Sequence, residues 1–165
     1  MSPRISVILD TDFLSAFLKI DHLQTVRDFY GVDRLLVPMA VYREISQTDL
    51  LPSLVAISWI QVQIANQVQL RELLRDEALL RLGSGEQEAI ALAIQRENSI
   101  LLINDNKART EAVRLGVQGV NIPAFLLACK LSGFLNLPTL SQVITSLEDR
   151  DRYKFRSEVR ARLLL

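Results

Sequence analysis

The sequence predicts an α/β fold: a three-layer α/β/α sandwich with a central, mostly parallel sheet. Short apolar runs alternate along the chain with longer segments in which apolar residues recur at helical spacing. The runs are apolar at nearly every position, as in strands that are buried on both faces. Alternating strands and helices form βαβ units, which build a parallel sheet covered by helices on both sides.

Four segments are the expected strands. Residues 5–9 and 100–103 are mostly apolar, and residues 35–37 form a similar run that ends at Pro38. Residues 58–64 alternate more between apolar and polar side chains, which predicts a strand at an edge of the sheet. Helical spacing is found over residues 11–20, 39–45, 67–80, 85–97, 107–115 and 124–131.

Length and composition indicate one soluble domain. The chain has 165 residues, of which 49% are hydrophobic and 23% charged. Residues 1–135 form the expected main domain, and residues 136–165 a C-terminal helical extension that would act as a lid or as an arm facing another subunit. Cys129 has no partner for an internal disulfide, and there is neither a signal-peptide pattern nor an apolar run of about 20 residues. We therefore expect a cytoplasmic protein without membrane contact.

Acidic residues gather where the predicted strands end. In open α/β sheets, ligands bind beyond the carboxyl ends of the strands. Six acids lie at or near those ends or at the starts of helices, namely Asp10, Asp12, Glu44, Glu86, Glu88 and Asp105. Each also has an ordinary explanation. Asp10 and Asp105 can cap helices, Glu86 and Glu88 suit the first turn of a helix that Ser84 would cap, and Glu44 can pair with Arg43.

Together, these acids predict a site for a divalent cation. Two unit charges 5 Å apart at an effective dielectric constant near 20 repel by roughly 3 kcal/mol, so a cluster needs protons or a cation. Carboxylate oxygens are hard ligands that suit Mg²⁺ or Mn²⁺. Zinc and thiol chemistry are disfavoured because His22 and Cys129 are the only residues of their types. A carboxylate-bound metal can activate water and orient a phosphodiester.

Four blocks in this order resemble the PIN-domain family: VILDTDFLSAF, LLVPMAVYREI, GSGEQEAIALA and LLINDNKARTEAVRLGV. The last two resemble a prokaryotic subgroup with Gly-Glu-x-Glu-Ala-Ile and Asp-Asp-x-x-Ala-Arg segments. The resemblance extends from about residue 5 to residue 133. It implies a PIN-like nuclease domain with metal-dependent endoribonuclease activity on RNA. It also implies a toxin of a toxin–antitoxin pair, with a small antitoxin protein as partner and a homodimeric state.

The resemblance implies that Asp10, Glu44, Glu86 or Glu88, and Asp105 bind Mg²⁺ or Mn²⁺. Glu86 and Glu88 lie about 200° apart around a helix, so both cannot face one site. Glu86 is nearer the apolar side, and we predict it as the ligand, with Glu88 and Asp12 as further candidate catalytic residues. The chain departs from the subgroup at Asn104, where an acid is expected, and at Asn106, where a basic residue is common. The departure at Asn104 would weaken metal binding if that acid is a ligand.

Two other functions fit parts of the sequence. A haloacid-dehalogenase-like phosphatase would use Asp10 and Asp12 as an Asp-x-Asp motif, but Leu14 stands where that family has Thr or Val. A non-catalytic PIN-like module would bind RNA or a partner without cutting, which Asn104 favours.

The basic C-terminal segment carries two further hypotheses. In a helix, Arg152, Arg156 and Arg160 would share one face that could bind RNA phosphates, or they could simply be solvated. The apolar end at residues 163–165, together with the high hydrophobic content, suggests a two-fold dimer.

Overall fold

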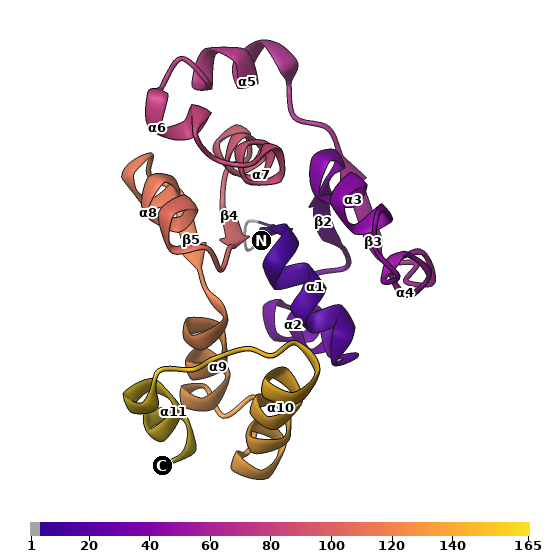
Figure 1. Cartoon of the computed structure of the whole chain (residues 1–165), viewed down its shortest axis with the longest axis vertical. Helices are drawn as coiled ribbons and strands as arrows, with labels where there is room; N and C mark the ends of the chain where they lie inside the picture. Colours follow the sequence, from indigo (N-terminus) through magenta and orange to yellow (C-terminus); the bar gives the residue numbers. More distant parts are fainter. Residues whose placement is uncertain (1–3) are drawn as a thin grey trace.

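The computed structural model describes residues 4–165 and contains one sheet of five parallel strands. Its order is β3-β2-β1-β4-β5, and all neighbouring pairs are parallel. The strands are β1 (Ser6–Leu9), β2 (Leu35–Pro38), β3 (Ile60–Gln63), β4 (Ser99–Leu102) and β5 (Gln118–Val120). β1 and β4 lie side by side with Leu9 opposite Leu102, so both strands end at the same place. This is the predicted three-layer α/β/α architecture (Figure 1).

Two groups of helices cover the two faces of the sheet (Figure 1). One face packs against α1 (Thr11–Lys19), α2 (Leu23–Tyr30), α3 (Met39–Ser46), α4 (Leu51–Val55), α9 (Ile122–Leu131), α10 (Leu137–Arg150) and α11 (Ser157–Leu164). The other packs against α5 (Gln67–Leu73), α6 (Glu77–Leu80), α7 (Ser84–Gln95) and α8 (Asn106–Arg114). Strand side chains alternate between the two clusters: Val7 and Leu9 join the first, and Ile8 joins the second. The sheet is thus buried on both faces, which explains its continuous apolar runs.

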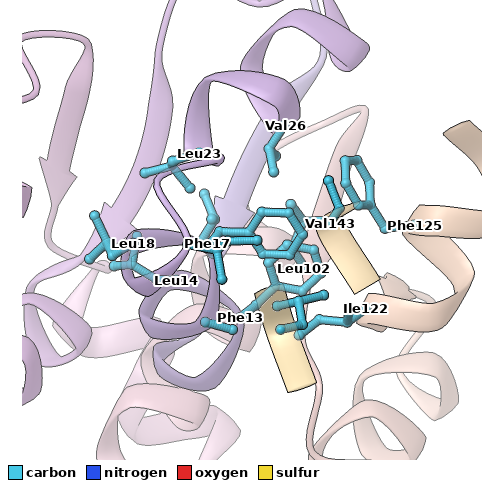
Figure 2. Packing of buried hydrophobic residues seen from close by; sticks show 14 of the residues in the cluster. Phe13, Leu14, Phe17, Leu18, Leu23, Val26, Leu102, Ile122, Phe125 and Val143 are labelled. Atoms are coloured by element: carbon cyan, nitrogen blue, oxygen red, sulfur yellow. The ribbon is translucent and has the colours of Figure 1, made fainter. Parts of the chain in front are cut away.

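Aromatic side chains fill the core beneath α1. Phe13 and Phe17 stack with ring centroids 4.9 Å apart, and both meet the Phe125 ring of α9 edge-on. Figure 2 shows these rings converging with Leu102 and Val143, which come from β4 and α10. Because α1 starts directly after β1, this packing fixes the helix on which Asp12 lies and the chain turn at Asp10.

Three elements are not predicted by the sequence patterns, namely α2, α4 and β5. β5 has only three residues, QGV, and α4 only five. The predicted helix over residues 67–80 is two helices, because the Asp76 side chain accepts a hydrogen bond from Ala78 N–H and starts α6. The predicted edge strand is confirmed as β3. Within residues 4–165, none of the helices combines the length and apolar character needed to cross a membrane.

The C-terminal helices pack on the main body. Leu140, Ile144 and Leu147 of α10 and Leu163 of α11 are buried in the same cluster as β1 and α1. Of the three terminal leucines that suggested an uncovered apolar end, Leu163 is therefore covered, while Leu165 is 88% exposed.

The expected arginine face on one C-terminal helix is wrong. α10 ends at Arg150 and α11 begins at Ser157, so Arg152 lies in an irregular segment and Arg156 only caps α11. Arg160 does lie in α11, but its guanidinium pairs with Glu148 of α10 at 3.0 Å. The chain leaves the helical conformation at Arg152, whose φ is +56°.

Candidate active site

Asp10 lies at the centre of the carboxyl edge of the sheet. It follows β1, and its backbone N–H donates to the carbonyl of Leu102 in β4 (2.9 Å). Its side chain is buried, with 2% exposure, and Oδ1 has no hydrogen-bond partner within residues 4–165. Burial disfavours the charged form and raises the pKa of Asp10 to about 7, and the charges of Glu86, Asp12 and Glu44 act in the same direction. Asp10 also occupies the N-cap position of α1, but its side chain makes no capping bond.

Glu44 is held in place by two donors from different elements. Its Oε2 accepts a hydrogen bond from the Thr11 hydroxyl (2.7 Å), and its Oε1 accepts one from the backbone N–H of Gly85 (3.2 Å). Glu44 therefore links α3 to the starts of α1 and α7. A Cβ atom at position 85 would lie 2.6 Å from Glu44 Oε1, so a larger residue there would force the carboxylate to move from this position.

Glu86 lies in the first turn of α7 and faces the other acids. Its Oε1 accepts a hydrogen bond from the N–H of Gly83, which is the N-cap in place of the predicted Ser84. Burial raises the pKa of Glu86, and the charges of Asp105, Asp12 and Glu44 add to this effect. These interactions place Glu86 among the acids that surround Asp10.

Glu88 has a different surrounding. It is 6% exposed, and its two oxygens accept hydrogen bonds from the N–H groups of Ala40 (2.7 Å) and Ala65 (3.2 Å). Ala40 lies in the first turn of α3, and Ala65 follows β3. Glu88 thereby ties α7 to α3 and to the edge strand. The two glutamates lie in different surroundings, as their angular separation predicts, but the prediction that Glu86 is nearer the apolar side of α7 is wrong, because Glu88 is the buried one and Glu86 is only half-buried.

Asp105 and Asp12 complete the group. Asp105 caps α8 through a hydrogen bond from Ala108 N–H to its Oδ1 (2.9 Å), so its proposed capping role is real. Asp12 is exposed in the first turn of α1. Partial burial of its carboxyl raises the pKa of Asp12, followed by the charges of Asp105, Asp151 and Glu44. Carboxylates from four elements thus repel one another at one edge of the sheet.

Asn104 anchors other parts of the chain. Its Oδ1 accepts hydrogen bonds from the N–H of Ile122, at the start of α9, and from the hydroxyl of Tyr153 (both 3.2 Å). Asn104 therefore connects the end of β4 to two C-terminal segments. The subgroup has an acid at this position, but here the amide oxygen of Asn104 accepts hydrogen bonds from two protein donors. Asn104 therefore has a structural role.

The donor chemistry fits a hard divalent cation. A buried carboxylate oxygen without a partner is costly unless a proton or cation meets it, and Asp10 Oδ1 is such an atom. In residues 4–165, however, no three His, Cys, Asp or Glu side chains already form a group compact enough to hold a metal ion. Each carboxylate oxygen in use keeps a second lone pair, so Glu44, Glu86 and Asp105 remain able to act as ligands.

Sequence reasoning alone did not identify the residues that hold these acids in place. Thr11 and Gly85 fix Glu44, and Tyr153 binds Asn104 across 49 residues of sequence. A glycine inside an otherwise helical pattern was the available signal for Gly85, since it often marks a close approach. Nothing in the sequence points to the partner of Tyr153.

Comparison with known proteins identifies the family. Searches among curated proteins and among solved structures gave no significant match. A family model described as a PIN domain matches residues 6–164, nearly the whole chain and further than the resemblance read from the four blocks. Together with the five-stranded parallel sheet and its acidic carboxyl edge, this match shows that the chain belongs to the PIN-domain family and has its nuclease-type fold.

Proposed function

We propose that this protein is a Mg²⁺- or Mn²⁺-dependent endoribonuclease that hydrolyses RNA phosphodiesters. The observation that carries the proposal is Asp10, a buried carboxylate at the carboxyl edge of a parallel sheet, with three acidic neighbours and an oxygen that has no hydrogen-bond partner among residues 4–165. Strongly perturbed carboxyl groups of this kind are typical of functional sites. Membership of a family with a nuclease-type fold gives the chemistry that such a site serves.

Asp10, Glu44, Glu86 and Asp105 are the proposed metal ligands. When bound, the cation would supply an activated water molecule and neutralise charge on the phosphodiester. The protein's own contribution is to hold the acids close together by hydrogen bonds. Glu44 accepts from Thr11 and Gly85, Glu86 accepts from Gly83, and Asp105 accepts from Ala108. Asp12 is more exposed and is proposed to act at the entrance. We propose no ligand role for Glu88, whose oxygens are used by Ala40 and Ala65.

The family match favours a nuclease over the phosphatase alternative, in which Asp10 would be a nucleophile. The non-catalytic module remains the second candidate. It is favoured by Asn104, which stands in place of an acid and whose oxygen is used by Ile122 and Tyr153. The two candidates differ in whether bound RNA is cut.

We further propose that the protein is the cytoplasmic toxin of a toxin–antitoxin pair and forms a homodimer. Exposed apolar side chains at the ends of α9 and α11 support self-association: Leu131 is 76% exposed and Leu165 is 88% exposed. Sedimentation at micromolar concentration should show a dimer, and a monomer would contradict this part of the proposal. A short reading frame for an antitoxin immediately upstream of the gene would support the pairing.

The decisive experiment measures cleavage of single-stranded RNA with Mg²⁺ or Mn²⁺ by the wild type and by Asp10→Asn. We expect the substitution to lower the cleavage rate by at least roughly a hundredfold, because it removes a charged ligand while keeping the side-chain volume. Asp33→Asn is the matched control, since Asp33 is exposed at the opposite edge of the sheet. Activity that survives exhaustive chelation would contradict the proposal, and RNA binding without cleavage would favour the non-catalytic module.

A further inference from the structure

Residues 151–156, here named the C-terminal strap, join α10 to α11 and contact Asn104, in the loop after β4, by one hydrogen bond. In Figure 1 the strap is the yellow coil that joins these two helices. Asp151 pairs with Lys19 at the end of α1, with 2.8 Å between Nζ and Oδ1. Tyr153 donates its hydroxyl hydrogen bond to Asn104, the residue before Asp105. The strap is therefore fastened at two points, to the end of α1 and to the residue that precedes Asp105.

The strap is packed against the body. Tyr153 and Phe155 are partly buried against the main core cluster, and their ring centroids lie 4.6 Å apart. Tyr153 also brings the strap next to the acids, because its hydroxyl lies 3.2 Å from Asn104 Oδ1 and Asn104 directly precedes Asp105. The backbone between Asp151 and Tyr153 thus lies at the rim of the acidic group.

Arg152 is the residue between these two fastenings. It is exposed and makes neither an ion pair nor a side-chain hydrogen bond with residues 4–165. Its φ of +56° lies in the left-handed region, which non-glycine residues rarely adopt. Such a conformation persists only where surrounding contacts fix it, here those of Asp151 and Tyr153. Lys19, the neighbouring cation, is already paired with Asp151.

The acids repel the phosphates of an RNA strand, and a cation at the rim would help to hold the phosphates that lie beyond the proposed metal. The planar guanidinium of arginine matches phosphate oxygens in a bidentate arrangement. We propose that Arg152 is a substrate-binding residue that contacts a phosphate of single-stranded RNA at the rim of the acidic site. This inference rests on the proposed ribonuclease function. In place of a helix face formed by three arginines, it assigns the phosphate contact to a single arginine in the strap.

The test measures the dissociation constant for a single-stranded RNA oligonucleotide in the Asp10→Asn background, where turnover is expected to be slow, across a salt series. Arg152→Asn removes the charge, and asparagine tolerates the left-handed conformation, so the strap should remain folded. We expect roughly tenfold weaker binding, as for the loss of one charge-assisted contact. The log–log salt slope should fall by about 0.7, the value for one phosphate of a single strand.

Arg34→Asn is the matched control, because Arg34 is equally exposed but lies at the opposite edge of the sheet. It should leave the affinity and the salt slope unchanged. In the otherwise wild-type enzyme, Arg152→Asn should raise KM and leave kcat nearly constant. An unchanged salt slope in Arg152→Asn, or an equal loss in Arg34→Asn, would overturn the role of Arg152 alone. If the parent protein binds no RNA, both this inference and the proposed function fail.

Discussion

The two edges of the sheet carry opposite charges. At the carboxyl edge lie Asp10, Glu44, Glu86 and Asp105, whereas a cleft of about 700 Å³ at the amino edge is lined by Arg4, Arg34 and Arg96. Helix dipoles account for part of this separation, since helix N-termini favour anions and C-termini favour cations. Asp105 caps α8, and Arg96 follows the last residue of α7. Charge sign alone therefore says little about function.

The carboxyl edge differs from the amino edge in the burial and hydrogen bonding of its charged groups. Arg96 at the amino edge has a partner, donating to Gln63 Oε1 at 2.7 Å, and Arg4 and Arg34 are open to solvent. Asp10 is buried, makes no capping bond, and has an oxygen without a partner within residues 4–165. The comparison shows that an unpaired buried charge marks the candidate site better than a cluster of one sign.

The largest expected effect on folding comes from the acid that is fully paired. Glu88→Gln should lower the free energy of unfolding by about 3 kcal/mol, because an amide keeps one acceptor and turns an NH₂ group toward a backbone N–H. Glu86→Gln should cost less than about 1 kcal/mol, since its carbonyl can still accept from Gly83, but it should impair cleavage. Urea unfolding and RNA cleavage assays of both variants test this. Equal stability losses would remove the contrast between the two glutamates.

An intermediate effect on the free energy of unfolding is expected from the ionisation of Asp10. Its folded-state pKa of about 7 lies above the ordinary aspartate pKa of 3.8, so its contribution to stability is present below pH 3.8 and is lost as the pH rises through 7. The metal-free protein should therefore become less stable between pH 4 and pH 8. Asp10→Asn should flatten this dependence and be more stable than the wild type at pH 8 by about 2 kcal/mol.

Added Mn²⁺ provides the second measurement for Asp10. It should raise the thermal unfolding midpoint of the wild type more at pH 8 than at pH 5, where Asp10 is protonated. Asp10→Asn should respond little at either pH. A wild-type midpoint that ignores Mn²⁺ at pH 8 would argue against a metal at this edge.

The smallest effect on the free energy of unfolding is expected from a substitution at the amino edge. Arg96→Gln loses a hydrogen bond to Gln63 and a favourable charge at the end of α7, so unfolding should be easier by about 1 kcal/mol. The pH dependence and the response to Mn²⁺ should stay as in the wild type. Differential scanning calorimetry with and without Mn²⁺ measures both. A lost Mn²⁺ response would mean that the two edges are coupled.

The sequence predicted the parts of this molecule that depend on local pattern. Buried strands were visible as apolar runs, and acids directly after them were expected at one edge because parallel strands end together. Helical geometry also separated Glu86 from Glu88, because two residues span a fixed angle. The capping of α8 by Asp105 was predictable for the same reason, because it depends only on neighbouring residues in the chain.

The parts that depend on distant contacts could not be predicted. Asn104 looked like a weakened metal ligand, but its environment is set by Tyr153 and Ile122, which no periodic pattern connects to it. The tail arginines have helical spacing, yet the helix is interrupted because Asp151 and Tyr153 are fastened to the body. β5 is too short and too polar to show a strand pattern.

The close approach at Gly85 has a consequence for the evolution of this fold. A side chain at position 85 would displace the Glu44 carboxylate from its place beside the Gly85 N–H, so a change at one position alters the surroundings of the other. In relatives of this chain, we expect the residues at these two positions to change together. Where position 85 carries a larger residue, position 44 should more often lack the acid that is proposed here as a metal ligand.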